Sequence, residues 1–503
     1  MDRVFSRWMT ELSLKKGVAV GVNSGQGAVK AAARAYEAAR NALEYRAEHL
    51  VRRAAIERIL KRELVLAEEP EIAADHLDQE LSWADYTGEG EEQQKTRNLI
   101  IATLKKYKFF IAESGLERNW LTGVMSAEIE NILNSNPDYG LFSKLGYAFM
   151  RRKFDVKNSN IDLPLSIAIE RVMNQADDQV VSFKLFLLIQ SQTHENPMEA
   201  IKKAYEIFMA SKNNKLTGKL SNIVKKNVGP IIILRDMYFT NPEEFLTALT
   251  EKENFEKLGG LVFDEQVYRM KERIGRATVR SLIYIFLTKM LFVFILEVPI
   301  QKFTQSGINM TAMGINLALP LALMWFLAGT IRLPGKSDKE KLLKESWQVT
   351  RELSTAATEE IKLTQKKTQM AEIASRVFYI LYSIFFVLIF TAIFWMLKKV
   401  QFGIIDMVIF LFFTSVVSFF AFRIRQNLVL YKISKGRNRE ETLVDLLLLP
   451  LVVAGSAISK EVSRLNFLIF IFDFVLEAPF KSILRFIDGW FEFLSIRKEE
   501  VME

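Results

Sequence analysis

The sequence contains no cysteine among its 503 residues, and it contains only three histidines. The missing thiols exclude disulfide bonds, iron–sulfur clusters, thiolate zinc sites and a cysteine nucleophile. His49, His76 and His194 lie too far apart along the chain to indicate a metal cluster. We therefore expect neither a metal ion nor a cofactor.

The signatures of common enzyme families are missing as well. The glycines between residues 17 and 30 follow neither the spacing of a P-loop nor that of a dinucleotide fingerprint. There is no nucleophile elbow, no paired-histidine metalloprotease motif and no kinase signature. The basic, amphipathic start lacks the apolar core and cleavage site of a secretory signal. We therefore predict no catalytic residues and an amino terminus that stays in the cytoplasm.

Apolar residues are abundant: they make up 50% of the chain, while 25% of the residues are charged. This mixture predicts a membrane part joined to a soluble part. Four runs reach the roughly 20 apolar residues that cross a bilayer, at about 281–300, 312–331, 377–397 and 403–422. Basic flanks precede the first and third runs and follow the second and fourth, outnumbering Lys398 and Lys399 on the other side. The pattern predicts a multi-pass inner-membrane protein with two transmembrane hairpins.

The part before residue 275 has helical signals almost throughout. Asparagine caps followed by proline occur at 136–137, 196–197 and 241–242, with Glu199 and Glu244 in the first turns that follow. Gly259 and Gly260 have the composition of a helix-ending cap. No run of alternating β-branched residues competes. The sequence predicts an all-α fold, with a helical cytoplasmic domain followed by a polytopic α-helical membrane domain.

Shifts in composition suggest how the chain is divided. The acidic, glycine-containing stretch 67–94 is typical of an exposed connection. Pro450, Gly455 and scattered charges interrupt two apolar segments near the carboxyl terminus, so these segments are either re-entrant or interfacial. We predict amino-terminal amphipathic helices at 1–66, an acidic linker at 67–94, a helical cytoplasmic domain at 95–275, a first transmembrane hairpin at 276–331, a cytoplasmic helix at 332–376, a second hairpin at 377–424, and a basic linker with the carboxyl-terminal helices at 425–503.

Two amphipathic stretches have more than one interpretation. In 332–376, apolar residues recur every seven positions from Leu342, but Ser346, Glu360 and Lys367 occupy the partner positions. This pattern favours a helix that packs on the soluble domain over a dimerising coiled coil. The helix expected at 41–64 is rich in Arg and Lys, but glutamates are interleaved with them. A solvated amphipathic helix is therefore favoured over a nucleic-acid surface.

The segments YEAARNALEYRAEHLVRRAAIERILKREL, RSLIYIFLTKMLFVFILEVPI and INLALPLALMWFLAGTIRLPG carry a resemblance. In these segments the chain resembles a family of uncharacterised polytopic membrane proteins of candidate-phyla-radiation bacteria. The resemblance implies a bacterial inner membrane, and it implies no functional residues.

A repeated motif is the most informative feature of the sequence. FVFILEVP at 292–299 matches FDFVLEAP at 472–479, including a shared Glu-x-Pro. Each copy carries one polar stripe at helical spacing. The second copy is also explained by an interfacial helix in which Glu477 pairs with Lys481. The candidate intramembrane polar residues are Lys289, Glu297, Pro299, Asp473, Glu477 and Pro479.

The sequence leaves three functions in order of preference. The first is a non-enzymatic membrane scaffold whose cytoplasmic helices bind a protein partner or a second copy of the chain. The second is an ion or small-solute transporter or channel subunit in which the two Glu-x-Pro helices line a polar path, with Lys289 facing Asp473. A membrane hydrolase comes third. The bilayer is the expected non-protein partner, and the interleaved charges argue against nucleic acid.

Overall fold

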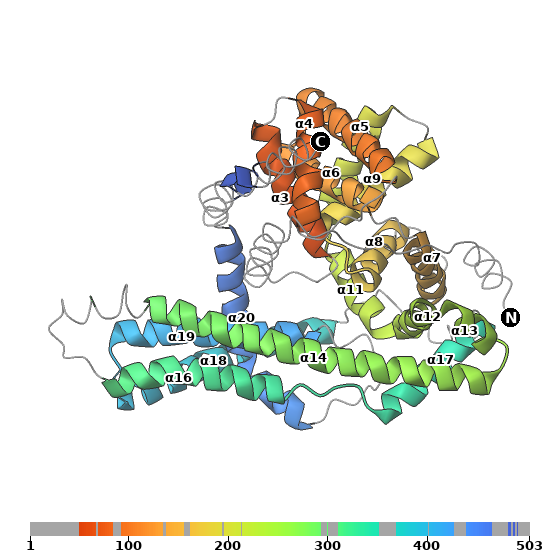
Figure 1. Ribbon diagram of the computed structural model, residues 1–503. Helices are drawn as coiled ribbons and strands as arrows, with labels where there is room; N and C mark the ends of the chain where they lie inside the picture. Colours follow the sequence, from red (N-terminus) through yellow and green to blue (C-terminus); the bar gives the residue numbers. More distant parts are fainter. Residues whose placement is uncertain are drawn as a thin grey trace, which may run out of the picture. The chain divides into compact units, whose positions relative to one another are not determined.

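The computed structural model is built from α-helices in the residues that it describes (Figure 1). It describes residues 50–66, 69–83, 92–133, 137–154, 161–193, 196–212, 214–292, 299, 310–351, 369–400, 402–426, 439–464, 481–483, 486–487 and 490. Every regular element in these ranges is helical, so the fold is all-α as the sequence predicts. The chain divides into two compact units. Unit 1 comprises Met1–Arg152, Val156–Val224 and Asn466–Glu503, and unit 2 comprises Lys153–Asp155 and Lys225–Leu465.

Unit 1 is organised around one buried helix. Helix α6 buries nine of its residues, from Trp120 to Ile129, and packs on α3, α5 and α9. A single apolar core joins these helices to α4 and α10. The helices of this unit are α3 (Val51–Leu66), α4 (Pro70–Trp83), α5 (Glu92–Glu113), α6 (Arg118–Leu133), α7 (Pro137–Arg152), α8 (Asp162–Met173), α9 (Asp178–Thr193) and α10 (Pro197–Lys212). Helix α11 (Lys215–Asn227) crosses into unit 2.

Local capping chemistry determines several helix starts. Helices α7, α10 and α13 begin at Pro137, Pro197 and Pro242, as the Asn-Pro pairs predict. The Asn241 side chain accepts a hydrogen bond from the Glu244 amide at 3.2 Å. Because proline lacks an amide hydrogen and asparagine caps its neighbours, these starts depend on adjacent residues only.

Two expectations for unit 1 differ from the structure. Residues 70–83 of the expected acidic linker form α4, which packs on α3 and α5 and buries Leu77, Leu81 and Trp83. Helix α3 is not solvated, because charged residues such as Arg53 and Glu63 are only 1% exposed. Both helices carry their apolar residues at helical spacing, and several of their charges form ion pairs inside the unit.

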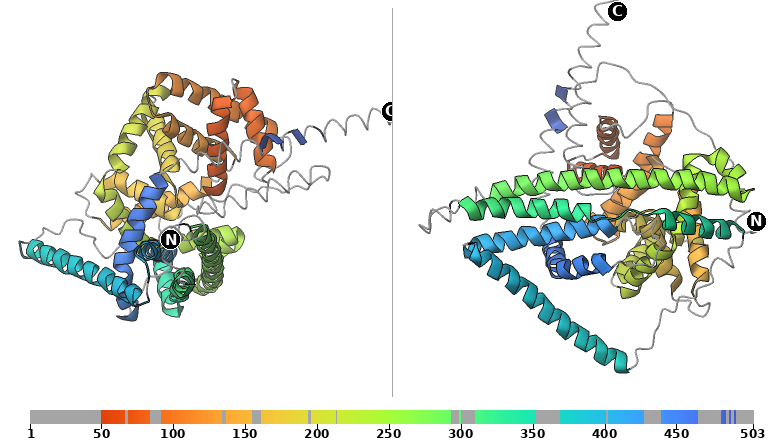
Figure 2. Two further views of the ribbon diagram at one scale, coloured as in Figure 1. Left: turned by 90° about the vertical axis from the view of Figure 1, so that its left-hand side faces the viewer. Right: turned by 90° about the horizontal axis from the view of Figure 1, so that it is seen from below.

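Unit 2 has two parts that share the helix α14 (Lys252–Phe292). The polar layer consists of the first part of α14 with α12, α13 and α17, and the apolar bundle consists of the last part of α14 with α16 and α19. The 41-residue helix α14 is about 60 Å long at 1.5 Å per residue (Figure 1). Its first part packs on α12, α13 and α17, and its last part packs on α16 and α19. Figure 2 shows α14 and α16 running side by side in the view from below. The other helices are α12 (Gly229–Thr240), α13 (Pro242–Ala248), α16 (Met310–Gly329), α17 (Lys336–Arg351), α18 (Gln369–Lys399), α19 (Ile404–Gln426) and α20 (Arg439–Arg464).

The sequence predicted that Gly259 and Gly260 end a helix. This prediction is wrong, because both glycines lie inside α14. A Cβ added at Gly259 would come within 2.5 Å of the Leu343 side chain on α17. The glycine pair therefore lets α17 approach closely. This agrees with the packing helix expected in this loop, whose Leu342 and Val349 are fully buried.

The apolar segments of unit 2 differ in length. Among the described residues, one helix is long and apolar enough to cross a membrane, at Val377–Lys399 in α18. The apolar stretches of α16, α19 and α20 are shorter: Gly314–Gly329, Asp406–Phe422 and Leu446–Ile458. The first expected span, 281–300, lies partly outside the described residues. Helix α20 continues through Pro450 and Gly455, where the sequence suggested an interruption.

Candidate functional site

The candidate site in unit 2 is built around Lys289, which lies in the last turn of α14. Its side chain is fully buried, with 0% exposure. Residues of α14, α16 and α19 form the surrounding apolar core, which includes Ile285 one turn earlier, Met324 and Phe413. A buried ammonium group in such surroundings loses its hydration and requires compensation.

Groups that carry no charge contribute to this compensation. The Lys289 ammonium donates a hydrogen bond to the backbone carbonyl of Asn316 on α16. It also lies over the rings of Phe413 and Phe410 on α19, 5.1 Å and 5.8 Å from their centroids. Cation–π contacts of this kind strengthen when water is excluded. Lys289 thereby connects three helices of the bundle.

Proline chemistry explains why the carbonyl of Asn316 can accept this bond. In a helix, the amide of residue 320 would donate to the carbonyl of residue 316. Residue 320 is Pro320, which lies inside α16 and has no amide hydrogen. The freed carbonyl belongs to the residue that Lys289 contacts. We infer that Lys289 satisfies the carbonyl that Pro320 leaves without its helical donor.

The polar side of α19 continues the site toward α20. Thr414, Ser415 and Ser418 are all buried, and the Ser418 hydroxyl donates to the Thr414 carbonyl at 2.8 Å. On α20, Gly455 approaches so closely that an added Cβ would overlap the Ser415 carbonyl oxygen. Small residues at such contacts let helices pack backbone to backbone, as membrane helices often do.

The structure places some of the sequence-predicted residues. Lys289 is buried as described, and Pro299 is helical and half-buried. Glu297, Asp473, Glu477 and Pro479 lie outside the described residues. The Lys289–Asp473 contact and the polar path therefore stay predictions.

Sequence reasoning missed the partners that Lys289 has in the structure. These partners come from two helices that are distant in the chain: Asn316 from α16, and Phe410 and Phe413 from α19. Pro320, which frees the Asn316 carbonyl, also lies in α16. One signal was available: a proline within an apolar helix frees a carbonyl four residues earlier. Nothing in the spacing showed that the donor would come from α14.

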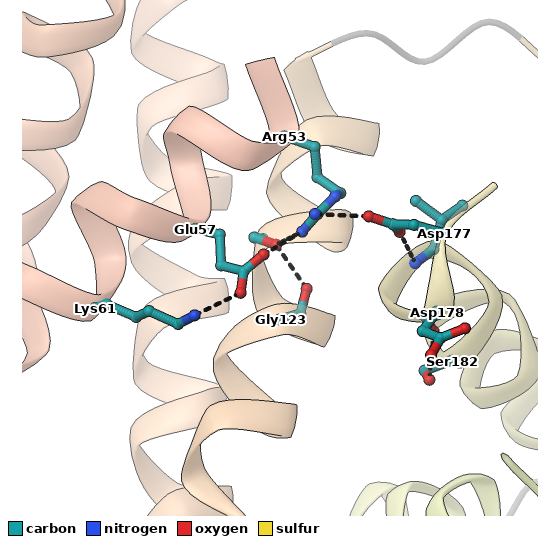
Figure 3. A network of polar contacts seen from close by, with 9 residues as sticks. Arg53, Glu57, Lys61, Gly123, Asp177, Asp178 and Ser182 are labelled. Atoms are coloured by element: carbon teal, nitrogen blue, oxygen red, sulfur yellow. Dashed lines mark hydrogen bonds and ion pairs between the residues drawn. The ribbon is translucent and has the colours of Figure 1, made fainter. Parts of the chain in front are cut away.

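Unit 1 buries its charges in a different way, as Figure 3 shows around Arg53. The guanidinium group is bound by Glu57 at 2.7 Å and by Asp177, before α9, at 2.6 Å. It also donates to the Ser126 hydroxyl at 2.9 Å, and Lys61 contacts Glu57 from the exposed side at 2.7 Å. Burial disfavours the Glu57 carboxylate, but the charges and hydrogen bonds of Arg53 and Lys61 outweigh it and lower the pKa of Glu57 to about 2.

A second buried cluster joins α3, α4 and the carboxyl-terminal residues of unit 1. Arg62 donates to Glu80 at 2.5 Å, and the Lys481 ammonium lies 3.8 Å from the other oxygen of Glu80. Glu63 pairs with His76 Nδ1 at 2.6 Å. In this cluster, ionic contacts link α3, α4 and the described residues near Lys481.

The described residues offer little for a cofactor. They contain no group of three His, Cys, Asp or Glu side chains that could hold a metal ion. An open groove of about 530 Å³ lies between α14 and α16 in unit 2. Its lining is entirely apolar: Leu282, Ile283, Phe286, Leu321, Ala322 and Trp325. Such a groove suits hydrocarbon and provides no group to orient a polar substrate.

Comparison of the chain with protein-family models, with curated proteins and with solved structures gives no match.

Proposed function

We propose that the chain is a non-enzymatic, multi-pass inner-membrane protein that acts as a scaffold, with its helical unit 1 in the cytoplasm binding a protein partner. The observation that carries the proposal is the continuity of α14. One helix supports a polar layer along its first part and an apolar bundle along its last part. A continuous helix resists bending, so it holds the polar layer at a fixed distance from the membrane.

The chemistry of the two parts of unit 2 supports a membrane boundary along α14. The amino-terminal part carries exposed ion pairs, Lys339–Asp264 at 2.6 Å and Arg269–Glu265 at 2.5 Å. Leu261 and Tyr268 are also exposed in this part, at 61% each. In the carboxyl-terminal part the exposed apolar side chains follow one another more closely, at Val279, Ile283 and Phe286. Water suits the first surface and lipid the second.

Helix α18 supplies the best bilayer-crossing segment. Many of its large apolar side chains between Val377 and Met396 are exposed, and the others are half-buried, as in a helix that contacts lipid. Tyr379 lies near one end, and Trp395 lies near the other with Lys399 stacked on its ring at 3.8 Å. Aromatic and basic residues at both ends are typical of helices anchored at two membrane interfaces. The remaining spans of the proposed topology belong to the shorter apolar helices.

Exposed apolar side chains of unit 1 are candidates for the partner surface. Leu187 and Leu188 on α9 are 43% and 42% exposed. Photocross-linking from a benzophenone at Leu187→Cys in native membranes should give one defined adduct with another protein. The same probe at Lys202→Cys, an exposed polar position on α10, is the control. Absence of an adduct at residue 187 would contradict the partner assignment.

Transport is the second candidate because Lys289 is buried in the apolar bundle. Proteoliposome flux separates the two functions. A scaffold should show proton, cation and anion fluxes equal to those of empty liposomes, both for the native chain and for Lys289→Met. Flux above that baseline which Lys289→Met abolishes would replace the scaffold with a transporter.

Rigidity of α14 provides the structural test. Spin labels at Glu265→Cys and Ile283→Cys should be about 27 Å apart along the helix, in a single narrow distribution. The native chain has no cysteine that would interfere. The distribution should be the same with and without an ion gradient. A gradient-dependent second distance would show that α14 bends and would favour transport.

A further inference from the structure

The described residues near the carboxyl terminus of unit 1 include a buried cation and exposed apolar side chains. Residues 481–483, 486–487 and 490 are helical. Lys481 is 2% exposed and points its ammonium group at Glu80, which is 1% exposed. Glu80 also receives Arg62 from α3. The segment therefore contacts α4 through a buried ion pair.

This segment also has an exposed apolar face. Four large apolar side chains among the described residues of this segment are exposed, whereas the Lys481 side chain is buried. Their exposed fractions are high: Ile483 57%, Phe486 73%, Ile487 36% and Trp490 53%.

We propose that this face, defined by Ile483, Phe486, Ile487 and Trp490, lies in the interfacial region of the lipid bilayer and holds unit 1 at the membrane surface through Lys481 and Glu80. The inference rests on the proposed membrane location of the chain. It adds a second attachment point, one that belongs to unit 1 itself.

Two observations favour lipid over another protein as the occupant. The sequence that leads into the segment, LNFLIFIFDFVLEAPF at 465–480, has 12 apolar residues among 16, with Asn466, Asp473 and Glu477 as its polar residues. Such a predominantly apolar stretch suits a membrane. The face itself combines Trp and Phe with aliphatic residues, which is the composition of helices that lie in a membrane interface.

The test uses the full chain in liposomes of phosphatidylcholine and phosphatidylglycerol, with an NBD label on one introduced cysteine at a time. The positions are Phe486→Cys on the face, Leu388→Cys at the centre of the candidate span, and Leu99→Cys on α5. Leu99 is the matched control, because it is an apolar residue of unit 1 with 55% exposure. Lipids with a doxyl group near the headgroup or deep in the acyl chain act as quenchers.

The label at 486 should be quenched several-fold more strongly than the label at 99, and the shallow quencher should be more effective than the deep one. The label at 388 should prefer the deep quencher. Quenching at 388 without quenching at 486 would overturn the inference and leave the membrane location intact. No quenching at 388 would overturn the proposed span, whatever happens at 486.

A second measurement tests the connection to unit 1. Spin labels at Leu99→Cys and Phe486→Cys report the position of the segment within the unit. The native chain should give a narrow distance distribution. Lys481→Glu, which sets a carboxylate against Glu80, should broaden it while residue 486 still meets lipid. Equally broad distributions in both chains would show that Lys481 does not hold the segment.

Discussion

Arg53 in unit 1 and Lys289 in unit 2 are both buried cations, exposed by 1% and 0%, but their surroundings differ. Arg53 is neutralised by the carboxylates of Glu57 and Asp177. Lys289 is held by a neutral carbonyl and two aromatic rings. Loss of the Arg53 guanidinium group would therefore leave two carboxylates uncompensated in unit 1. Loss of the Lys289 ammonium group would remove a hydrogen bond to a carbonyl and contacts with two rings in unit 2. The two cations thus connect their helices through different chemistry.

The largest expected effect is that of Arg53→Met. Removing the guanidinium group leaves Glu57 and Asp177 without their buried partner, which should lower the free energy of unfolding by about 3–5 kcal/mol. Lys61→Met removes a cation from the same glutamate, but the Lys61 side chain is 43% exposed. That control should cost less than about 1 kcal/mol. Equal losses in denaturant unfolding would contradict the assignment of Arg53 as the buried partner.

Low pH should destabilise the same cluster around Arg53 and Glu57. The folded-state pKa of Glu57 is about 2, below its ordinary value of 4.5. Its contribution to stability is therefore present above pH 4.5 and is lost as the pH falls toward 2. The difference in pKa corresponds to roughly 3 kcal/mol of unfolding free energy. Glu57→Gln should flatten the pH dependence between 4.5 and 2 in unfolding experiments. An unchanged slope would show that other carboxylates cause the pH dependence of the unfolding free energy.

Two glycine substitutions in unit 2 distinguish the energetic effect of close helix packing from the effect of helix propensity. Gly455→Ala in α20 places a Cβ against the Ser415 carbonyl and should destabilise the bundle by about 1–3 kcal/mol. Gly275→Ala in α14 meets no atom within 4 Å and should stabilise the helix by roughly 0.5–1 kcal/mol. Thermal unfolding in detergent measures both. A neutral Gly455→Ala would mean that α19 and α20 are not in close contact.

The smallest expected effect is that of Lys289→Met. It removes the hydrogen bond to the Asn316 carbonyl but also the desolvation cost of a buried ammonium group, so the net change should be within about 1 kcal/mol. The contact itself is tested by a double-mutant cycle with Pro320→Ala, which restores the helical amide. Lys289→Met should cost less in the chain that carries Pro320→Ala than in the native chain. Additive effects would rule out the link between Lys289 and Pro320.

These contrasts show which features the sequence could reveal. The helix starts at Pro197 and Pro242 were predicted because capping depends on adjacent residues. Helix α18 was predicted because a long apolar run needs no partner to be recognised. The all-α fold follows from many such local signals.

Features that depend on distant residues were missed. Gly259 and Gly260 have the same composition as a helix cap, and only α17, much later in the chain, shows that they permit close packing. The burial of Arg53 depends on Asp177, which no helical spacing connects to α3. Likewise, Lys289 was identified as unusual, but its acceptor became evident only when α16 was placed beside α14. Tertiary contacts decided each of these cases.

The most direct test of the membrane scaffold follows the exposed face of α14 from the polar layer into the apolar bundle. Single spin labels replace Leu261, Tyr268, Val279, Ile283 and Phe286, all of which are exposed. In reconstituted membranes, the account predicts access to a water-soluble relaxing agent at 261 and 268 and access to oxygen from lipid at 283 and 286. Access to the water-soluble agent at all five positions would contradict a membrane boundary along α14.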